Sequence, residues 1–125
     1  MPNKQIPLVE DDPFLRDIYS KKLEKAGFVV VNVNNGEQAL KVLKGAVFDL
    51  VLLDIVMPNI DGWEVLEKIK CPEAEVKTKV IVFSNLGQKS EVEKGLSLGA
   101  DKYLIKSSYT PSEVVEEVKK LITNN

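Results

Sequence analysis

The sequence predicts an α/β fold, a (βα)5 arrangement in which helices cover both faces of a doubly wound parallel five-stranded sheet. Five short apolar runs of strand length alternate along the chain with five segments whose apolar residues recur at helical spacing. The strand-length runs are rich in Val, Ile and Leu, as expected for strands that are buried on both faces. With 125 residues the chain has the length of one domain, so we expect residues 1–125 to form a single domain.

The composition excludes several classes of site. The net charge of −2 offers no basic field for nucleic acid. The chain has no histidine, which excludes a Ser-His-Asp triad and a His-based zinc site. Its single cysteine, Cys71, cannot form an intrachain disulfide and fits a reducing compartment. Because neither a signal peptide nor a membrane-spanning run is apparent, we expect a cytoplasmic protein without a membrane or nucleic-acid partner.

The first strand and helix follow from local signals. Ile6–Val9 is a short apolar run, and Asp12-Pro13 is a favourable helix start, with Asp as the N-cap and Pro at the first helical position. Apolar residues then recur at helical spacing until Gly27, which predicts the end of the helix.

The next elements run to the middle of the chain. Phe28–Val33 is a β-branched strand, and Asn34-Asn35-Gly36 turns into a helix that ends at Gly45. Phe48–Asp54 is the most apolar strand candidate, and it ends abruptly in a carboxylate. Asp54 is followed by residues 55–62, whose Pro, Asn, Asp and Gly content predicts a loop.

The second half repeats the alternation. A helix marked by Trp63, Val65, Leu66 and Ile69 is expected to break at Cys71-Pro72, before a polar linker over residues 73–78. The remaining expected elements are a strand from Val80 to Ser84, a helix from Gln88 to Leu98 stopped by Gly99, a strand from Lys102 to Lys106, and a helix that opens with the capping box Thr110-Pro111-Ser112-Glu113.

Polar residues that can bind a metal or take part in a reaction gather at the carboxyl ends of these strands. In chain order they are Glu10, Asp11, Asp54, Ser84 and Lys106. Parallel strands place their carboxyl ends at one edge of the sheet, where open α/β sheets bind ligands. Clustered carboxylates repel unless a cation lies among them, and an all-oxygen ligand set favours Mg²⁺. A metal, a carboxylate nucleophile, a hydroxyl and an ammonium together indicate phosphoryl transfer.

Five motifs follow one another along the chain: Val9-Glu10-Asp11-Asp12, Leu52-Leu53-Asp54-Ile55-Val56-Met57-Pro58, Asp61-Gly62, Val82-Phe83-Ser84 and residues 99–106. This ordered set resembles the receiver domain of bacterial response regulators, of the chemotaxis-regulator kind. The resemblance covers the whole chain and implies the flavodoxin-like strand order 2-1-3-4-5.

The resemblance assigns metal and phosphoryl roles by position. It implies that Asp54 is the phosphoacceptor and that Asp11 is a direct Mg²⁺ ligand. It implies that Glu10 acts on the metal through water, and that Val56 supplies a backbone carbonyl. Asp12 is then the helix cap.

The remaining assigned residues belong to the expected switch. The resemblance implies that Ser84 turns toward the phosphoryl group, that Lys106 pairs with it, and that the rotamer of Tyr103 reports the state. The output face is then the fourth helix, fifth strand and fifth helix. Before phosphorylation, Lys106 can form an ion pair with Asp11 or Asp54, and Glu10 can be a solvated acid.

The function that the resemblance implies is a phosphorylation-dependent switch of a two-component system. A histidine kinase or phosphotransfer protein would donate the phosphoryl group, and a downstream protein would dock on the output face. The chain would act as a monomer or a phosphorylation-dependent dimer, and not as an enzyme beyond its own phosphoryl transfer and dephosphorylation.

Two other functions stay open. One is a pseudo-receiver that docks without phosphorylation. The other is an aspartyl-phosphate phosphatase, which generally carries a second acid two residues beyond the nucleophile, where this chain has Val56.

Three residues depart from the family pattern. Ser107 follows Lys106 where the family usually has Pro, so a cis bond there would be costly and the geometry of this loop is open. Pro7 falls in an expected central strand, so either this stretch lacks a partner or the strand begins later. Asn85 follows Ser84 where the family favours a small residue, which can narrow access to Asp54 or alter dephosphorylation.

Overall fold

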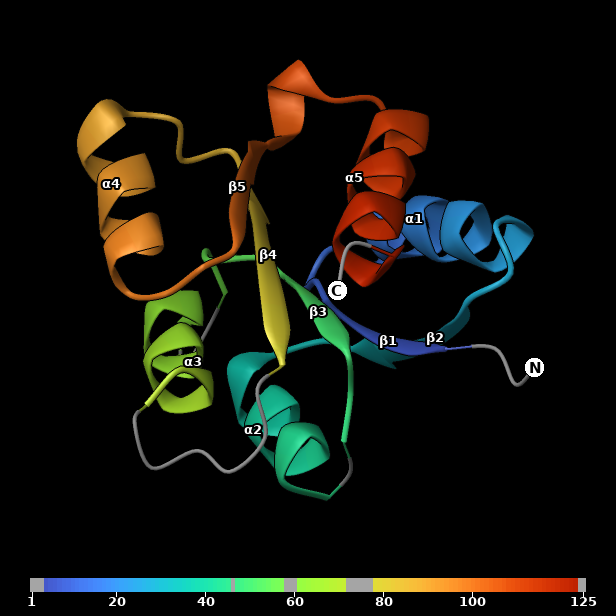
Figure 1. Cartoon of the computed structure of the whole chain (residues 1–125), viewed down its shortest axis with the longest axis horizontal. Helices are drawn as coiled ribbons and strands as arrows, with labels where there is room; N and C mark the ends of the chain where they lie inside the picture. Colours follow the sequence, from blue (N-terminus) through green and yellow to red (C-terminus); the bar gives the residue numbers. More distant parts are fainter. Residues whose placement is uncertain (1–3, 46, 58–60, 72–77, 124–125) are drawn as a thin grey trace.

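The structure is a computed structural model that describes residues 4–45, 47–57, 61–71 and 78–123. Its strands are β1 (Gln5–Val9), β2 (Val29–Val33), β3 (Leu50–Leu53), β4 (Lys79–Ser84) and β5 (Lys102–Ile105). Its helices are α1 (Pro13–Lys25), α2 (Gly36–Gly45), α3 (Gly62–Ile69), α4 (Lys89–Ser97) and α5 (Pro111–Thr123). All five strands are parallel in the order β2-β1-β3-β4-β5, which confirms the predicted fold class and strand order (Figure 1).

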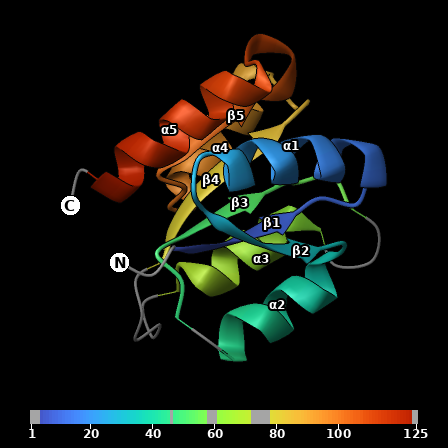
Figure 2. The ribbon, with the colours of Figure 1, turned by 90° about the vertical axis from the view of Figure 1, so that its right-hand side faces the viewer.

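Helices cover both faces of the sheet. Figure 2 shows α1 and α5 above the sheet and α2 and α3 below it. Successive residues of a strand point to opposite faces, so each strand contributes to two cores. Leu50 and Leu52 of β3 pack in the core with α1 and α5, whereas Val51 and Leu53 pack in the core with α2 and α3. All four are fully buried, as the continuous apolar run predicted.

Pro7 lies inside β1, and the register explains why it is tolerated. The main chains of Lys4 and Glu10 bond toward β2, since the Lys4 carbonyl accepts from Val29 and the Glu10 N–H donates to Val33. The main-chain groups of the odd-numbered residues of β1, Pro7 among them, therefore point toward β3. The pairing of β1 with β3 begins only at Leu8, so the missing N–H falls where the ladder is absent. Of the two explanations left open, the lack of a partner is confirmed on the β3 side only, because on the other side Pro7 is in register with Val31 of β2.

The helix ends follow the predicted signals. The Asp12 carboxylate accepts hydrogen bonds from the N–H groups of Phe14 and Leu15 at 2.9 and 3.4 Å. The predicted capping box at α5 is also present, because Thr110 and Glu113 exchange side chain to backbone hydrogen bonds at 2.8 and 3.2 Å. Gly99, beyond α4, has a φ of 107°, a conformation that favours glycine.

Parts of two predicted segments fall outside the described residues. The loop after Asp54 is described except for residues 58–60, and the linker before β4 is described only at Thr78. The preceding helix, α3, ends at Ile69, two residues before Cys71, in agreement with the predicted break. Across the described residues, no helix is both long enough and apolar enough to cross a membrane.

An ion-pair network joins α5 to the edge strand β5. Glu117 of α5 pairs with Lys102 of β5 and with Lys120 one turn later on α5. The hydrogen bonds from these two ammonium groups, that of Lys102 first, lower the pKa of the Glu117 carboxyl. The ionised form of Glu117 therefore stabilises the folded chain.

We expect the Glu117→Gln substitution to lower the free energy of unfolding at neutral pH. A lowered folded-state pKa gives stability that is present above the ordinary carboxyl pKa and is lost as the pH falls through the lowered value. The difference from wild type, measured by urea denaturation, should therefore shrink from neutral pH to about pH 3. Glu116→Gln, on an exposed residue of the same helix, is the control. A deficit that does not change with pH would contradict the role of this network.

Candidate functional site

The carboxyl edge of the sheet brings the predicted acids together. Glu10 and Asp11 follow β1, and Asp54 follows β3, whose neighbour in the sheet is β1. Each of the three offers a carboxylate oxygen, and these atoms all lie within 4.8 Å of one another. Glu10 and Asp54 are only 1% and 4% exposed, whereas Asp11 lies in an exposed bend. Glu10 is therefore not the solvated acid that the sequence left open.

Lys106 links the two buried acids. Its ammonium nitrogen lies 2.6 Å from Oε1 of Glu10 and 3.2 Å from Oδ2 of Asp54. The predicted ion pair with Asp54 is present, but the second partner is Glu10 and not Asp11. The physical reason is burial, because the Glu10 side chain points into the protein and Asp11 turns outward. The same ammonium lies 4.9 Å from the centre of the Phe83 ring, so the ring covers one side of the Lys106 ammonium.

The charges of this group depend on one another. Burial raises the pKa of the Asp54 and Glu10 carboxyls, against the effect of the nearby ammonium. Burial alone would lower the pKa of Lys106, but the hydrogen bond to Glu10 and the attraction of both carboxylates outweigh it and raise the value. The ammonium therefore stays charged, and it makes ionised carboxylates tolerable in a buried place.

Backbone groups fix the orientation of both acids. The Val56 N–H donates to Oδ1 of Asp54 at 3.3 Å, and the Asp12 N–H donates to Oε2 of Glu10 at 3.2 Å. Since Lys106 occupies the other oxygen in each case, each carboxylate is held at both oxygens. The Val56 side chain itself is 56% exposed, beside the mouth of the site.

Gly62 is required by a close approach behind Asp54. Its N–H donates to the carbonyl of Ile55 at 2.8 Å. A Cβ atom on Gly62 would lie 2.4 Å from the main-chain oxygen of Asp54 and 2.5 Å from Cα of Ile55. Backbone atoms cannot yield as a flexible side chain can, so any larger residue at this position would force the main chain behind Asp54 to shift.

Ser84 and Tyr103 are joined through one residue that the sequence analysis missed. Ser84 ends β4 and is fully buried, and its Oγ accepts the N–H of Leu86 at 3.2 Å. The Tyr103 hydroxyl donates to the carbonyl of the same Leu86 at 2.6 Å. A Cβ on Gly95 of α4 would lie 2.7 Å from the Tyr103 ring, so α4 packs closely on it. Because Leu86 contributes only main-chain groups, no side-chain signal could have identified it.

The structure shows the backbone at Ser107 and the exposure of Asn85, two of the three departures from the family pattern. Lys106–Ser108 forms a 3-10 turn, and the described residues contain no cis peptide bond, so the chain leaves Lys106 through a trans bond to Ser107. Asn85 is exposed beside Ser84. Its predicted effect on access to Asp54 or on dephosphorylation stays a prediction.

The acidic cluster fits a divalent cation in its chemistry. All its donors are carboxylate oxygens, the ligands that Mg²⁺ prefers, and the Asp11 side chain is exposed at the mouth. Three negative charges against one ammonium leave an excess that a divalent ion would neutralise.

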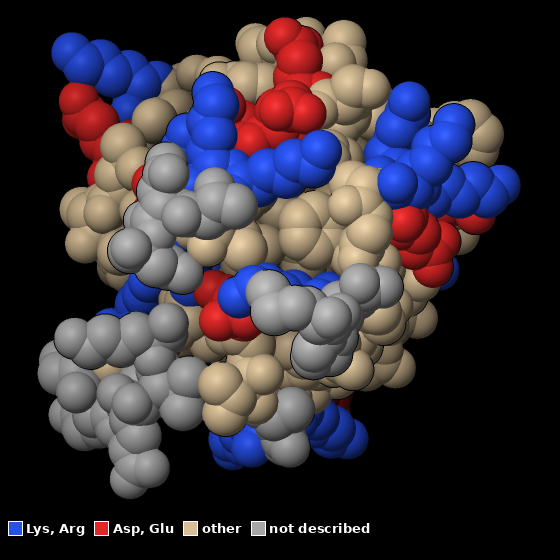
Figure 3. All heavy atoms as spheres, turned by 45° about the vertical axis from the view of Figure 1, so that its right-hand side comes forward, with Lys and Arg blue, Asp and Glu red and all other residues tan. Residues whose placement is uncertain are grey.

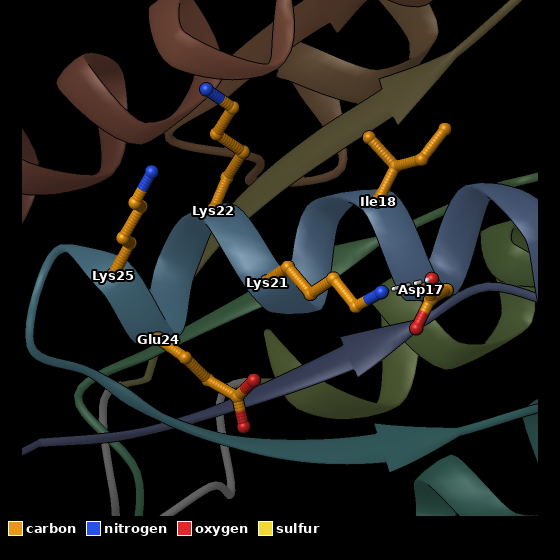
Figure 4. A pocket seen from close by; sticks show the side chains of 6 residues that line it. All are labelled: Asp17, Ile18, Lys21, Lys22, Glu24 and Lys25. Carbon is orange, nitrogen blue, oxygen red and sulfur yellow. Dashed lines mark ion pairs between the residues drawn. The ribbon is translucent and has the colours of Figure 1, made fainter.

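Other surface features do not compete with this edge. A hollow of about 540 Å³ on the outside of α1 is lined by Asp17, Ile18, Lys21, Lys22, Glu24 and Lys25, and no predicted site residue borders it (Figure 4). On the face in Figure 3, Lys and Arg side chains form separate groups with Asp and Glu beside them. The described residues of that face therefore form no continuous basic patch for nucleic acid.

Comparisons with known proteins give consistent results. The family model for the response regulator receiver domain matches residues 6–119. The chain is 33% identical over 120 residues to the chemotaxis protein CheY of Halobacterium salinarum, covering 96% of this chain and 98% of CheY. It is 38% identical over 106 residues to the transcriptional activator protein PfeR of Pseudomonas aeruginosa, covering 85% of this chain and 34% of PfeR.

Solved structures agree with this relationship. The response regulator DrrB of Thermotoga maritima has a TM-score of 0.85 and 30% identity, with 98% of this chain and 54% of DrrB covered. The chain spans about half the length of several curated regulators that it matches, or less, and nearly all of CheY.

We expect removal of the shared ammonium to destabilise the chain strongly. Lys106→Met leaves Glu10 and Asp54 buried without a counter-charge, a change that typically costs about 3–5 kcal/mol. Burial already raises the pKa of both carboxyls, so acidification will protonate them and the deficit in unfolding free energy should shrink below neutral pH. Urea denaturation with a metal chelator at several pH values measures this.

The matched control for this prediction is Lys21→Met, which removes an exposed lysine from α1. It should change stability by less than about 0.5 kcal/mol. A loss in Lys106→Met that stays constant as the pH falls would contradict the electrostatic explanation.

We also expect Gly62→Ala to destabilise the chain, by about 1–3 kcal/mol, because the added methyl group meets backbone atoms behind Asp54. Thermal or urea unfolding measures the loss. Glu67→Ala, at an exposed position of the same helix, serves as the control. If the two variants were equally stable, the close approach would carry no energetic weight.

Proposed function

The chain belongs to the response regulator receiver domain family, and from this we propose that it is a phosphorylation-dependent switch of a two-component system. The observation that supports this best is the buried carboxylate of Asp54, held 3.2 Å from the Lys106 ammonium beside two further acids. A buried carboxylate at the edge of a sheet, with a cation at its side, has the features of a phosphoryl acceptor.

In the proposed reaction, Asp54 is the nucleophile. One of its carboxylate oxygens attacks the phosphorus atom of a phosphohistidine on a partner kinase or phosphotransfer protein. An O–P bond forms on Asp54 as the N–P bond of the donor breaks, and the imidazole nitrogen keeps the electron pair. The Val56 N–H and Lys106 hold the carboxylate in a defined orientation before the attack, which lowers the entropic cost of the step.

Mg²⁺ is the cofactor that we propose for this step, held by Glu10, Asp11, Asp54 and the carbonyl of Val56. When bound, it would neutralise charge on the transferring phosphoryl oxygens. The all-oxygen donor set supports this assignment, and the share of each residue in binding is part of the proposal.

The signal arises from charge added to Asp54. A phosphoryl group brings about −1.5 to −2 charge to a site that now holds one ammonium. We propose that Lys106 moves from Glu10 to the phosphoryl oxygens and that the Ser84 hydroxyl donates to them. Since Leu86 bonds both Ser84 and Tyr103, a movement of its loop would reach the face formed by α4, β5 and α5.

The proposed partners follow from this scheme. A histidine kinase or phosphotransfer protein supplies the phosphoryl group, and a downstream protein docks on the face of α4, β5 and α5. We propose that residues 1–125 form one domain, that it works in the cytoplasm as a monomer or a phosphorylation-dependent dimer, and that its only catalysis is its own phosphoryl transfer and dephosphorylation.

We expect one phosphoryl group to be added to the wild-type chain by a small acyl phosphate with Mg²⁺, and none to Asp54→Asn. Intact mass measurement distinguishes the two. Asp17→Asn, on the exposed surface of α1, is the matched control and should be labelled like wild type. Chelation of Mg²⁺ should abolish labelling of the wild type.

Each other outcome has a meaning. Stoichiometric labelling of Asp54→Asn would remove Asp54 from its role. A wild type that binds Mg²⁺ but takes no phosphoryl group would favour the pseudo-receiver function. Turnover of many phosphomonoester molecules per chain would favour the phosphatase.

A further inference from the structure

Arg16 makes two contacts that bracket Asp11. It is the only arginine in a chain with 17 basic residues, and it is half-buried in α1. Its Nη1 donates to the carbonyl of Glu10 at 2.9 Å, and its backbone N–H donates to the carbonyl of Asp12 at 2.9 Å. The Arg16 side chain therefore holds the peptide group before Asp11, whereas its backbone N–H makes the first helical bond to the N-cap residue Asp12.

The position of the Asp11 carboxylate depends on the peptide group that precedes it. The Asp11 side chain is exposed, and the residue lies in a bend between β1 and α1. Its neighbour Glu10 is held by the Val33 carbonyl at its N–H and by Lys106 at its side chain. Arg16 adds the hold on the Glu10 carbonyl, which adjoins the Asp11 nitrogen, so the backbone delivers Asp11 to the cluster with Glu10 and Asp54.

The formation of α1 does not need this contact. Asp12 already caps the helix by accepting from Phe14 and Leu15, and Pro13 stands at its first position. A side chain that bonds a carbonyl upstream of the cap therefore acts on the loop and not on the helix.

We propose that Arg16 is a positioning residue that fixes Asp11 for a divalent cation. The inference rests on the proposed function, since it assumes that the acidic cluster takes Mg²⁺. Arginine suits the position because its guanidinium is planar, always charged and weakly hydrated, so it can hold a carbonyl in a half-buried place. Lysine offers a strongly hydrated point charge and would hold that carbonyl less firmly.

The test compares four chains: wild type, Arg16→Met, Arg16→Lys and the control Lys22→Met, which removes an exposed cation from the same helix. Calorimetric titration with Mg²⁺ measures affinity, and amide hydrogen exchange of the metal-free chains measures order at Asp11 and Asp12. We expect Arg16→Met to bind Mg²⁺ about tenfold more weakly, as is usual when a group that orients a metal ligand is lost. Its Asp12 amide should exchange faster, Arg16→Lys should fall between, and Lys22→Met should match wild type.

The outcomes separate this inference from the proposed function. A folded Arg16→Met with wild-type Mg²⁺ affinity and wild-type exchange would overturn the inference and leave the proposed function intact. If Arg16→Met does not fold, Arg16→Lys decides, because unchanged affinity and exchange in that variant also overturn the inference. If the wild type itself binds no Mg²⁺, the proposed metal site fails, and with it the role of Arg16 toward the cation.

Discussion

The central constraint of this structure is one ammonium that serves two buried carboxylates. Lys106 follows the edge strand β5, and its partners Glu10 and Asp54 follow β1 and β3 at the middle of the sheet. Buried charges are tolerated only beside an opposite charge, so this pairing fixes how the ends of three strands come together. The two cores, one on each face, bring the strands into register, and the pairing sets what chemistry their ends can support.

Most of the fold could be predicted because its signals are local. The apolar run before Asp54, the cap at Asp12 and the capping box at Thr110 each depend on neighbours in the sequence, and each is found as predicted. The edge that gathers the site residues also follows from topology alone, once the strands are known to be parallel. Pro7 could be placed only with the register in hand, since its tolerance depends on where the pairing of β1 with β3 begins.

The details of the site were harder to predict because they depend on direction and burial. Glu10 and Asp11 are adjacent acids in the sequence, yet Glu10 is buried in an ion pair with Lys106 and Asp11 is exposed. No spacing rule separates the two. The contribution of Leu86 was out of reach for a different reason, because it comes from main-chain groups that every residue except proline carries in full.

The bridge through Leu86 has a consequence for how the site is inherited. Both of its contacts use the peptide N–H and C=O, so the side chain at this position can vary while the link from Ser84 to Tyr103 persists. Methods that infer coupling from paired substitutions detect side chains that change together, so they have no signal from Leu86, whose part in the bridge is made by main-chain groups. Two positions at the ends of such a bridge can therefore stay linked when the side chain of the residue between them is replaced.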